Sequence, residues 1–302
     1  MTLPNAAFLT PIRIEDLDRN SAGGADFNLR VTCNAVTETL AFATITDGRN
    51  YWASGDSQSD MDAGVGGTGD LCLLLQDCLR AHSEGSSFAV SISSTNRVTI
   101  TCSSSFSILW NDSLTTLASA PFGFDQTDST SGTSLTSQNQ TLGAYCLETF
   151  IIDDSRWRAM TVGEAASSIA GSYRASYFGE AARERTVSFD MLPPSKALIE
   201  YQLADEPTGS FEWHWRNAFV QGKEMRFYED ASVRTSTSYS LAYLHPEQRD
   251  DPLKRDDFFR TEWTFELRMQ EVQTDASAED SQGGEVDSGA INELTIGGGT
   301  EL

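Results

Sequence analysis

The chain contains little lysine and little histidine. Only three of its 302 residues are lysine and three are histidine, and Lys plus Arg total 21 against 44 Asp plus Glu. The formal net charge is therefore -23 and the pI is near 4.3. A surface this acidic repels phosphate backbones. We therefore expect no direct nucleic-acid binding.

Long hydrophobic runs are also missing. No stretch approaches the roughly 18 apolar residues that a membrane helix needs. The first 20 residues lack a basic segment followed by an apolar one, so we expect no signal peptide and synthesis in the cytoplasm. None of the five cysteines forms a CxxC pair. Buried free thiols are the expected state.

Motifs that carry catalysis are incomplete. Gly55-Asp56-Ser57 resembles the start of a GDS-type hydrolase, but no Asp-x-x-His follows late in the chain. His82, His214 and His245 lie far apart in sequence and lack matched partners for a triad. The glycine-rich run 64–69 is not followed by Lys-Ser/Thr, which excludes a P-loop. We therefore expect a protein that is not an enzyme and needs no cofactor.

Four carboxylates near this glycine-rich run are the only metal candidates. Asp56, Asp60, Asp62 and Asp70 offer the hard oxygen ligands that calcium accepts from loops. Their spacing departs from the EF-hand pattern, and a terminal Glu is missing at the required offset. A solvated loop is the favoured interpretation, with calcium as the alternative.

The sequence has enough apolar residues for a sizeable core, at 39% hydrophobic and 10% aromatic. Apolar residues that alternate with polar ones dominate the sequence, and this pattern predicts β-strands. The clearest hairpin runs from Phe88 through a turn at 94–96 to Cys102. Further strands are predicted at 28–33, 40–45, 106–110, 145–152, 186–192, 197–203, 224–229, 236–244 and 263–272.

Helices are fewer. Helical spacing of Leu71, Leu74, Leu75, Cys78 and Leu79 predicts a helix from about 71 to 82, with Asp70 as N-cap. Other helices are predicted at 112–119, 162–169 and 211–221.

The predicted fold class is β-rich α+β, with two small antiparallel β-sheet domains that each carry one or two helices. The domains span residues 1–152 and 180–272, joined by a connecting segment at 153–179. Residues 273–302 are rich in Asp, Glu, Ser and Gly and bury too little apolar surface to fold alone. We expect them to form an extended acidic arm used in assembly, with a resting place on the same chain as the alternative.

Four aromatic residues are candidates for an interface. Phe122 and Phe124 flank Gly123 and either fill the core, which is favoured, or anchor a neighbour. Phe211, Trp215 and Phe219 share a helical face typical of a core, whereas Trp213 falls off this face and is a better candidate for an exposed contact. Tyr228 is the fourth.

One segment carries a resemblance. The run FAVSISSTNRVTITCSSSFSILWNDSLTTLASAPFGFD at 88–125 resembles uncharacterised virion proteins of tailed bacteriophages, in which a helix precedes such a hairpin and a Phe-Gly-Phe turn closes it. The second half, with Arg226 to Asp230 and the strand Glu262 to Met269, is more loosely similar to phage tail and connector proteins.

The resemblance implies a structural component of the virion, first a distal-tail or tail-tube-associated protein, then a neck, decoration or baseplate protein. Its partners would be copies of itself, in a symmetric ring, and other virion proteins. A carbohydrate- or receptor-binding module is the alternative, because short strands and exposed aromatics suit it. A calcium-dependent adhesive module is a third.

Overall fold

The structure is a computed structural model. It describes residues 6–20, 27–42, 45, 50–54, 70–147, 158–159, 163–167, 173–177, 183–232, 239–248, 250–255 and 262–271. Among the described residues, helices account for 17% and strands for 40%. Most of these strands form two antiparallel sheets, and β9 and β10 form a separate hairpin, which confirms the predicted β-rich α+β class. The acidic arm predicted at 273–302 lies outside the described residues.

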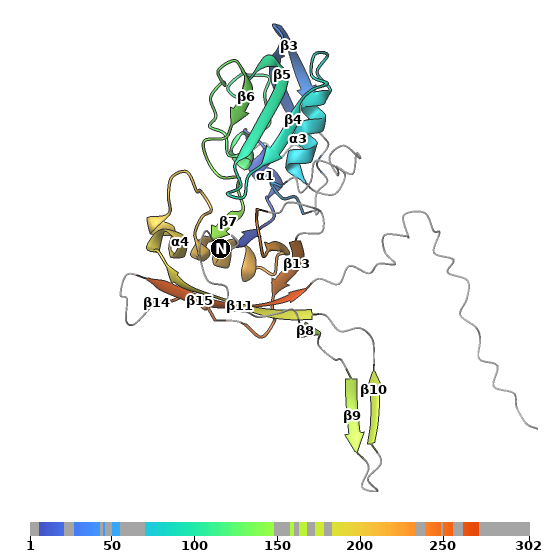
Figure 1. Ribbon diagram of the computed structural model, residues 1–302, viewed down its shortest axis with the longest axis vertical. Helices are drawn as coiled ribbons and strands as arrows, with labels where there is room; N and C mark the ends of the chain where they lie inside the picture. Colours follow the sequence, from blue (N-terminus) through green and yellow to red (C-terminus); the bar gives the residue numbers. More distant parts are fainter. Residues whose placement is uncertain are drawn as a thin grey trace, which may run out of the picture. The chain divides into compact units, whose positions relative to one another are not determined.

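The larger sheet has eight strands and follows the order β7-β1-β12-β13-β15-β11-β8, with β14 paired to β15 (Figure 1). Its strands are β1 (Ala6–Leu9), β7 (Ala144–Leu147), β8 (Arg158–Ala159), β11 (Arg183–Leu192), β12 (Met225–Tyr228), β13 (Tyr239–Leu244), β14 (Lys254–Arg255) and β15 (Trp263–Glu271). β1 and β7 precede residue 152 and pair with each other, and β1 also pairs with β12. The sheet therefore combines strands from both sides of the predicted domain boundary.

The smaller sheet has the order β3-β2-β5-β4, with β6 also paired to β5. Its strands are β2 (Asn28–Cys33), β3 (Val36–Ala41), β4 (Ala89–Ile92), β5 (Val98–Ile108) and β6 (Gly132–Thr136). The predicted hairpin at 88–102 is confirmed by β4 and β5. The prediction of a separate strand at 106–110 is wrong, because β5 continues to Ile108 through an irregularity between Thr101 and Phe106.

Helix α3 (Leu71–Arg80) confirms the predicted amphipathic helix. Its buried residues join the core of the smaller sheet, together with alternate residues of β2 and β5. All five cysteines are buried free thiols, as expected. In the part of the chain that the structure describes, no helix is both long and apolar enough to cross a membrane.

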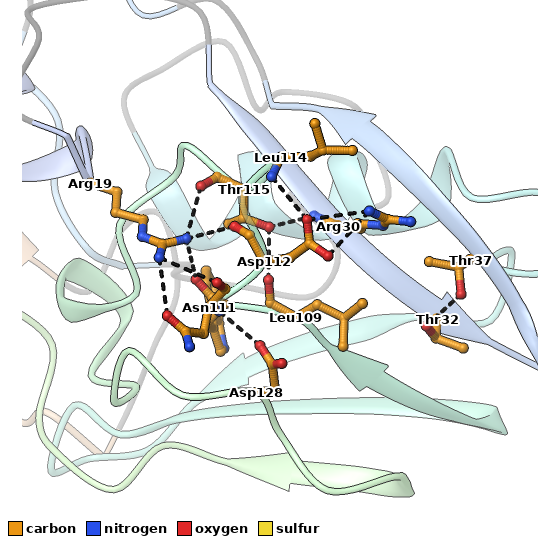
Figure 2. Close-up of polar contacts among 11 residues, drawn as sticks. Arg19, Arg30, Thr32, Thr37, Leu109, Asn111, Asp112, Leu114, Thr115 and Asp128 are labelled. Carbon is orange, nitrogen blue, oxygen red and sulfur yellow. Dashed lines mark hydrogen bonds and ion pairs between the residues drawn. The ribbon is translucent and has the colours of Figure 1, made fainter.

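The helix predicted at 112–119 is wrong, and Arg19 gives the reason (Figure 2). Its guanidinium donates hydrogen bonds to the carbonyl oxygens of Trp110 and Asp112, at 3.1 and 2.6 Å, and of Thr115 at 3.3 Å. The Asp112 carboxylate accepts from the backbone N–H of Leu114 at 2.9 Å. These bonds replace those that a helix would form within itself, so the segment is a loop. The short α1 (Ile14–Leu17) precedes Arg19.

Two other predicted elements also differ. The strand predicted at 197–203 is wrong: α4 (Pro194–Ala197) and the 3₁₀ turn η3 (Ile199–Tyr201) occupy this segment. Pro193-Pro194 begins a helical turn, because proline is favoured at the first helical position. The helix predicted at 162–169 is wrong as well, since β9 (Gly163–Ser167) and β10 (Tyr173–Tyr177) form an antiparallel hairpin. The 3₁₀ turn η2 (Ala120–Phe122) is a further short element.

The helix predicted at 211–221 is confirmed in two parts, α5 (Phe211–His214) and a π-helical turn η4 (Trp215–Phe219). The predicted apolar face is buried against the larger sheet. Phe211 stacks on Phe265 of β15 with ring centroids 4.0 Å apart. Phe8 of β1 packs against Phe219 at 5.9 Å. These aromatic contacts fix the position of α5, and with it the position of Trp213.

The turn between β2 and β3 contains a strained residue. Asn34 and Ala35 both have positive φ, at 50° and 65°. This is the conformation of a two-residue hairpin turn that favours Asn-Gly, and an alanine there costs about 1 to 2 kcal/mol.

Ala35→Gly should therefore raise the free energy of unfolding by about 0.5 to 1 kcal/mol, because the relieved strain exceeds the added chain entropy of glycine. Urea denaturation measures this change. Ala41→Gly is the matched control, since Ala41 is an exposed residue of β3 without positive φ and its replacement should destabilise the protein. If both variants are destabilised, the strain at Ala35 does not exist.

Candidate functional site

A cavity of about 290 Å³ lies beside Trp213. Its polar and aromatic lining includes Arg13, Asp16, Trp213, Asn217, Gln221 and Lys223. These residues come from two parts of the chain that are far apart in sequence: the segment that follows β1, and the segment from α5 to β12. Of the four interface candidates, Trp213 is therefore the one that the structure places beside a cavity.

The N-terminal wall is held by hydrogen bonds. The backbone N–H of Ile12 donates to the carbonyl oxygen of Tyr51 at 2.7 Å. The guanidinium of Arg13 donates twice to Asp16, from Nε to Oδ2 and from Nη2 to Oδ1, both at 3.1 Å. Because this ion pair is exposed to solvent, it contributes little to the stability of the fold. Its main effect is to orient the two side chains.

The opposite wall is built on α5 and the π-helical turn η4. Phe211 and His214 on either side of Trp213 are fully buried, which turns the indole outward and leaves it half-buried. Asn217 lies one turn further on, and its Nδ2 donates to the carbonyl oxygen of Trp213 at 2.9 Å. Gln221 Nε2 donates to the carbonyl oxygen of Arg216, also at 2.9 Å. Both amide side chains are thereby oriented.

The cavity carries two positive groups. Lys223 is half-buried, and its pKa is lowered from its ordinary value by burial and, second, by the charge of Arg13, while Asp16 acts in the opposite direction. Within the described ranges, no carboxylate forms an ion pair with Lys223. Two cations and one carboxylate therefore meet here, on a chain whose net charge is -23.

His214 lies behind Trp213. Its Nε2 faces the carbonyl oxygen of Thr208 at 2.7 Å and donates to it, and the Thr208 hydroxyl donates to the carbonyl oxygen of Ala144 in β7 at 3.0 Å. Burial lowers the pKa of His214 to about 4, so the imidazole is neutral at neutral pH. It supports the cavity wall and does not present a charge to it.

Asp70, the calcium candidate within the described residues, is 6% exposed and engaged in a buried ion pair. Its carboxylate contacts the guanidinium of Arg226 in β12 and accepts from the hydroxyl of Ser54 at 2.5 Å. Arg226 also lies over the rings of Trp52 and Tyr239, at 4.4 and 4.3 Å from their centroids. The other calcium candidates, Asp56, Asp60 and Asp62, lie outside the described residues, so a calcium site there stays a prediction.

The remaining interface candidates are inside the protein. Phe122 is fully buried and Phe124 is 3% exposed, and both stack on Trp110, with centroids 6.4 and 5.7 Å apart. Tyr228 is also fully buried and packs on Tyr239 at 5.6 Å. These three rings have no surface with which to contact a partner unless the core opens.

A second cavity, of about 500 Å³, is lined by Asp190, Asp250, Asp251 and Glu266 among others. The carboxylates of this cavity are groups that could bind a cation. Among the described residues, however, no three His, Cys, Asp or Glu side chains are grouped as a metal site requires.

Two features of the surface could not be found from the sequence alone. Ile199, Tyr201 and Leu203 are 37%, 55% and 49% exposed, although their alternation predicts a strand with one buried face. Arg13 and Lys223 meet only because β1 and β12 are neighbours in the larger sheet. The rarity of lysine was the one available signal, and it does not say which lysine matters.

The buried histidine makes stability depend on pH. The folded pKa of His214 is about 4 and its ordinary value is about 6.5, so the unfolded chain binds an extra proton between these values. The contribution of neutral His214 to the free energy of unfolding is fully present above about pH 6.5. It is lost as the pH falls toward about 4, by about 3 kcal/mol in total. Urea denaturation of the protein and of His214→Gln at several pH values measures the difference. Equal pH slopes for the two proteins would contradict the prediction.

Breaking the buried ion pair between Asp70 and Arg226 should destabilise the protein more than protonation of His214 does. Asp70→Asn should lower the free energy of unfolding by about 3 to 5 kcal/mol, because it removes the counter-charge of a buried guanidinium. Asp16→Asn is the matched control at an exposed pair and should cost less than about 1 kcal/mol. The double variant Asp70→Leu/Arg226→Met should be more stable than Asp70→Asn, and a double variant less stable than the single one would show that the charges themselves do not matter. Chemical denaturation measures all three.

Comparison with known proteins does not add to these observations. A scan against protein-family models finds no family that matches the chain, and a search of the curated proteins finds no match. A functional proposal therefore rests on the contacts, burial and charges of the described residues, together with the sequence resemblance given above.

Proposed function

We propose that this chain is a structural subunit of a tailed-phage virion that has no catalytic role and assembles with copies of itself. The observation that carries the proposal is the exposure of three apolar side chains close together in sequence, Ile199, Tyr201 and Leu203, whose segment we name the 199–203 surface. These side chains are 37%, 55% and 49% exposed within five consecutive positions. Single exposed apolar residues are common on monomers, whereas grouped ones are typical of interaction sites.

The backbone beneath this surface is held in place. The N–H of Ile199 donates to Glu212 Oε2 at 3.0 Å, and the hydroxyl of Ser210 donates to Gln202 at 2.9 Å. Just before the surface, the hydroxyl of buried Tyr145 donates to the carbonyl oxygen of Lys196 at 2.9 Å. A rigid segment loses little entropy on binding, so its exposed side chains are prepared to contact a partner.

The chemistry of the surface suits contact between proteins. Tyrosine is enriched among the residues that dominate interface energies, and aliphatic neighbours exclude water around it. The resemblance of residues 88–125 to virion proteins of tailed phages supports the setting. In that setting we propose a distal-tail or tail-tube-associated ring, since closed symmetric rings are a common form of assembly for identical subunits.

The net charge of -23 affects how such a ring forms. Subunits repel one another at low ionic strength, and salt screens this repulsion over the Debye length, about 30 Å at 0.01 M and 8 Å at 0.15 M. Burial of apolar surface is less affected by salt. A negatively charged ring would also not bind DNA that passes through it, which fits a tail component.

The mass in solution tests the proposal. Light scattering of the purified protein should show an oligomer whose fraction increases with salt between roughly 10 mM and 500 mM. Tyr201→Ala/Leu203→Ala should weaken association at least tenfold, because each truncated interface anchor costs about 2 kcal/mol or more.

The matched control is Leu114→Ala/Val220→Ala, which removes two apolar side chains that are each 51% exposed but lie outside the 199–203 surface. It should leave association unchanged. A monomer at every salt concentration, or equal effects of the two double variants, would overturn the proposal of self-assembly through this surface.

A further inference from the structure

We propose that the cavity beside Trp213 binds a carboxylate-bearing sugar, such as a uronic acid or sialic acid unit at the end or branch of a polysaccharide. This inference goes beyond the proposed function. It concerns residues outside the 199–203 surface, and it neither requires nor excludes self-assembly.

The charges of the cavity favour an anion. Arg13 uses Nε and Nη2 on Asp16, which balances that carboxylate and leaves its remaining N–H groups for a ligand. Lys223 is then the surplus positive charge, because the described residues provide no carboxylate that pairs with it. A half-buried ammonium group without a partner gains more from a ligand carboxylate than an exposed one does.

The rest of the lining favours a sugar over a bare anion. The half-buried indole of Trp213 offers a flat apolar face, and aromatic faces of this kind pack against apolar groups of a ligand while the ring N–H stays available to a polar one. Asn217 and Gln221 use their NH₂ groups on carbonyl oxygens of the helix. Their amide oxygens are left to accept hydrogen bonds, and hydroxyl groups are the donors that a sugar supplies.

Inorganic phosphate would satisfy only the charges. It has no apolar face for Trp213, and at neutral pH its one or two O–H groups offer fewer donors to the two amide oxygens than the hydroxyl groups of a sugar do. A neutral sugar would satisfy the indole and the amides but leave Lys223 without a partner. A carboxylate-bearing sugar is the class that uses all three kinds of group.

The size of the cavity limits the ligand. At about 290 Å³ it lies at the lower end of the range for small-molecule sites, about 300 to 1,000 Å³. One sugar unit is therefore the part that enters. The walls are stiff, since Pro11 and Pro207 form part of them and α5 is fixed by the stacking of Phe211 on Phe265.

Titration calorimetry with four separate probes tests this: glucuronate, N-acetylneuraminate, glucose and inorganic phosphate. At least one of the two acidic sugars should bind, and at least tenfold more tightly than glucose and phosphate. Lys223→Met should weaken that binding at least tenfold, because it removes a charge-assisted hydrogen bond to the ligand carboxylate. Trp213→Ala should weaken it to a similar degree.

Lys254→Met is the matched control. It removes the same charge from β14, where Lys254 is exposed and lines the other cavity, and it should leave binding unchanged. Binding of phosphate as tight as that of the acidic sugars would overturn the sugar assignment. Equal losses in Lys223→Met and Lys254→Met, or no binding of any probe to the unmodified protein, would overturn the site. Circular dichroism of each variant confirms that a loss of binding is not a loss of fold.

Discussion

The contact between Asp70 and Arg226 joins the two sheets. Asp70 immediately precedes α3, which packs in the core of the smaller sheet, and Arg226 lies in β12, within the larger sheet. Removing both charges from water is costly, and their attraction compensates for this only when the remaining hydrogen-bonding groups are satisfied. Ser54 bonds to the carboxylate, and Trp52 and Tyr239 cover the guanidinium. The pair is therefore worth more as a determinant of how the sheets meet than as a source of stability.

The cavity forms where the chain passes between the two sheets. The chain leaves the larger sheet after β1 and returns to it at β7, and these two crossings are bonded together, with the N–H of Thr10 donating to the carbonyl oxygen of Gly143 at 2.9 Å. Gly143 has φ of 76°, and a side chain there would meet the carbonyl oxygen of Thr10 at 2.4 Å. Only glycine permits so close an approach. The residues that follow β1 and precede β7 line the cavity, so the site is a consequence of the crossing.

The strands and helix that could be predicted from the sequence are those whose apolar period is complete within one segment. Helix α3, the hairpin of β4 and β5, and the buried face of Phe211, Trp215 and Phe219 are of this kind. The loop at 112–119 was not predictable, because its hydrogen bonds come from Arg19, more than 90 positions earlier. The segment 197–203 alternates like a strand, yet Pro193-Pro194 begins a helical turn before it. Of the site, Trp213 could be found from its place off the apolar face, whereas its pairing with Arg13 depends on strand order.

The placement of the arginines connects the charge of the chain with its two proposed surfaces. Arg19 bonds to backbone carbonyls, Arg226 pairs with Asp70, and Arg30 and Arg97 pair with Asp112 and Asp205. These arginines are paired within the protein, so the electrostatic potential at its surface stays negative. That potential repels both a second subunit and an acidic sugar. In the association of subunits, salt screens the electrostatic repulsion and leaves the apolar contact intact. For the sugar, salt weakens the long-range repulsion and also the short attraction to Lys223 and Arg13, although the latter is less screened because Lys223 is half-buried. The two processes therefore depend differently on ionic strength, since only the sugar site has an attractive charge contact that salt can weaken.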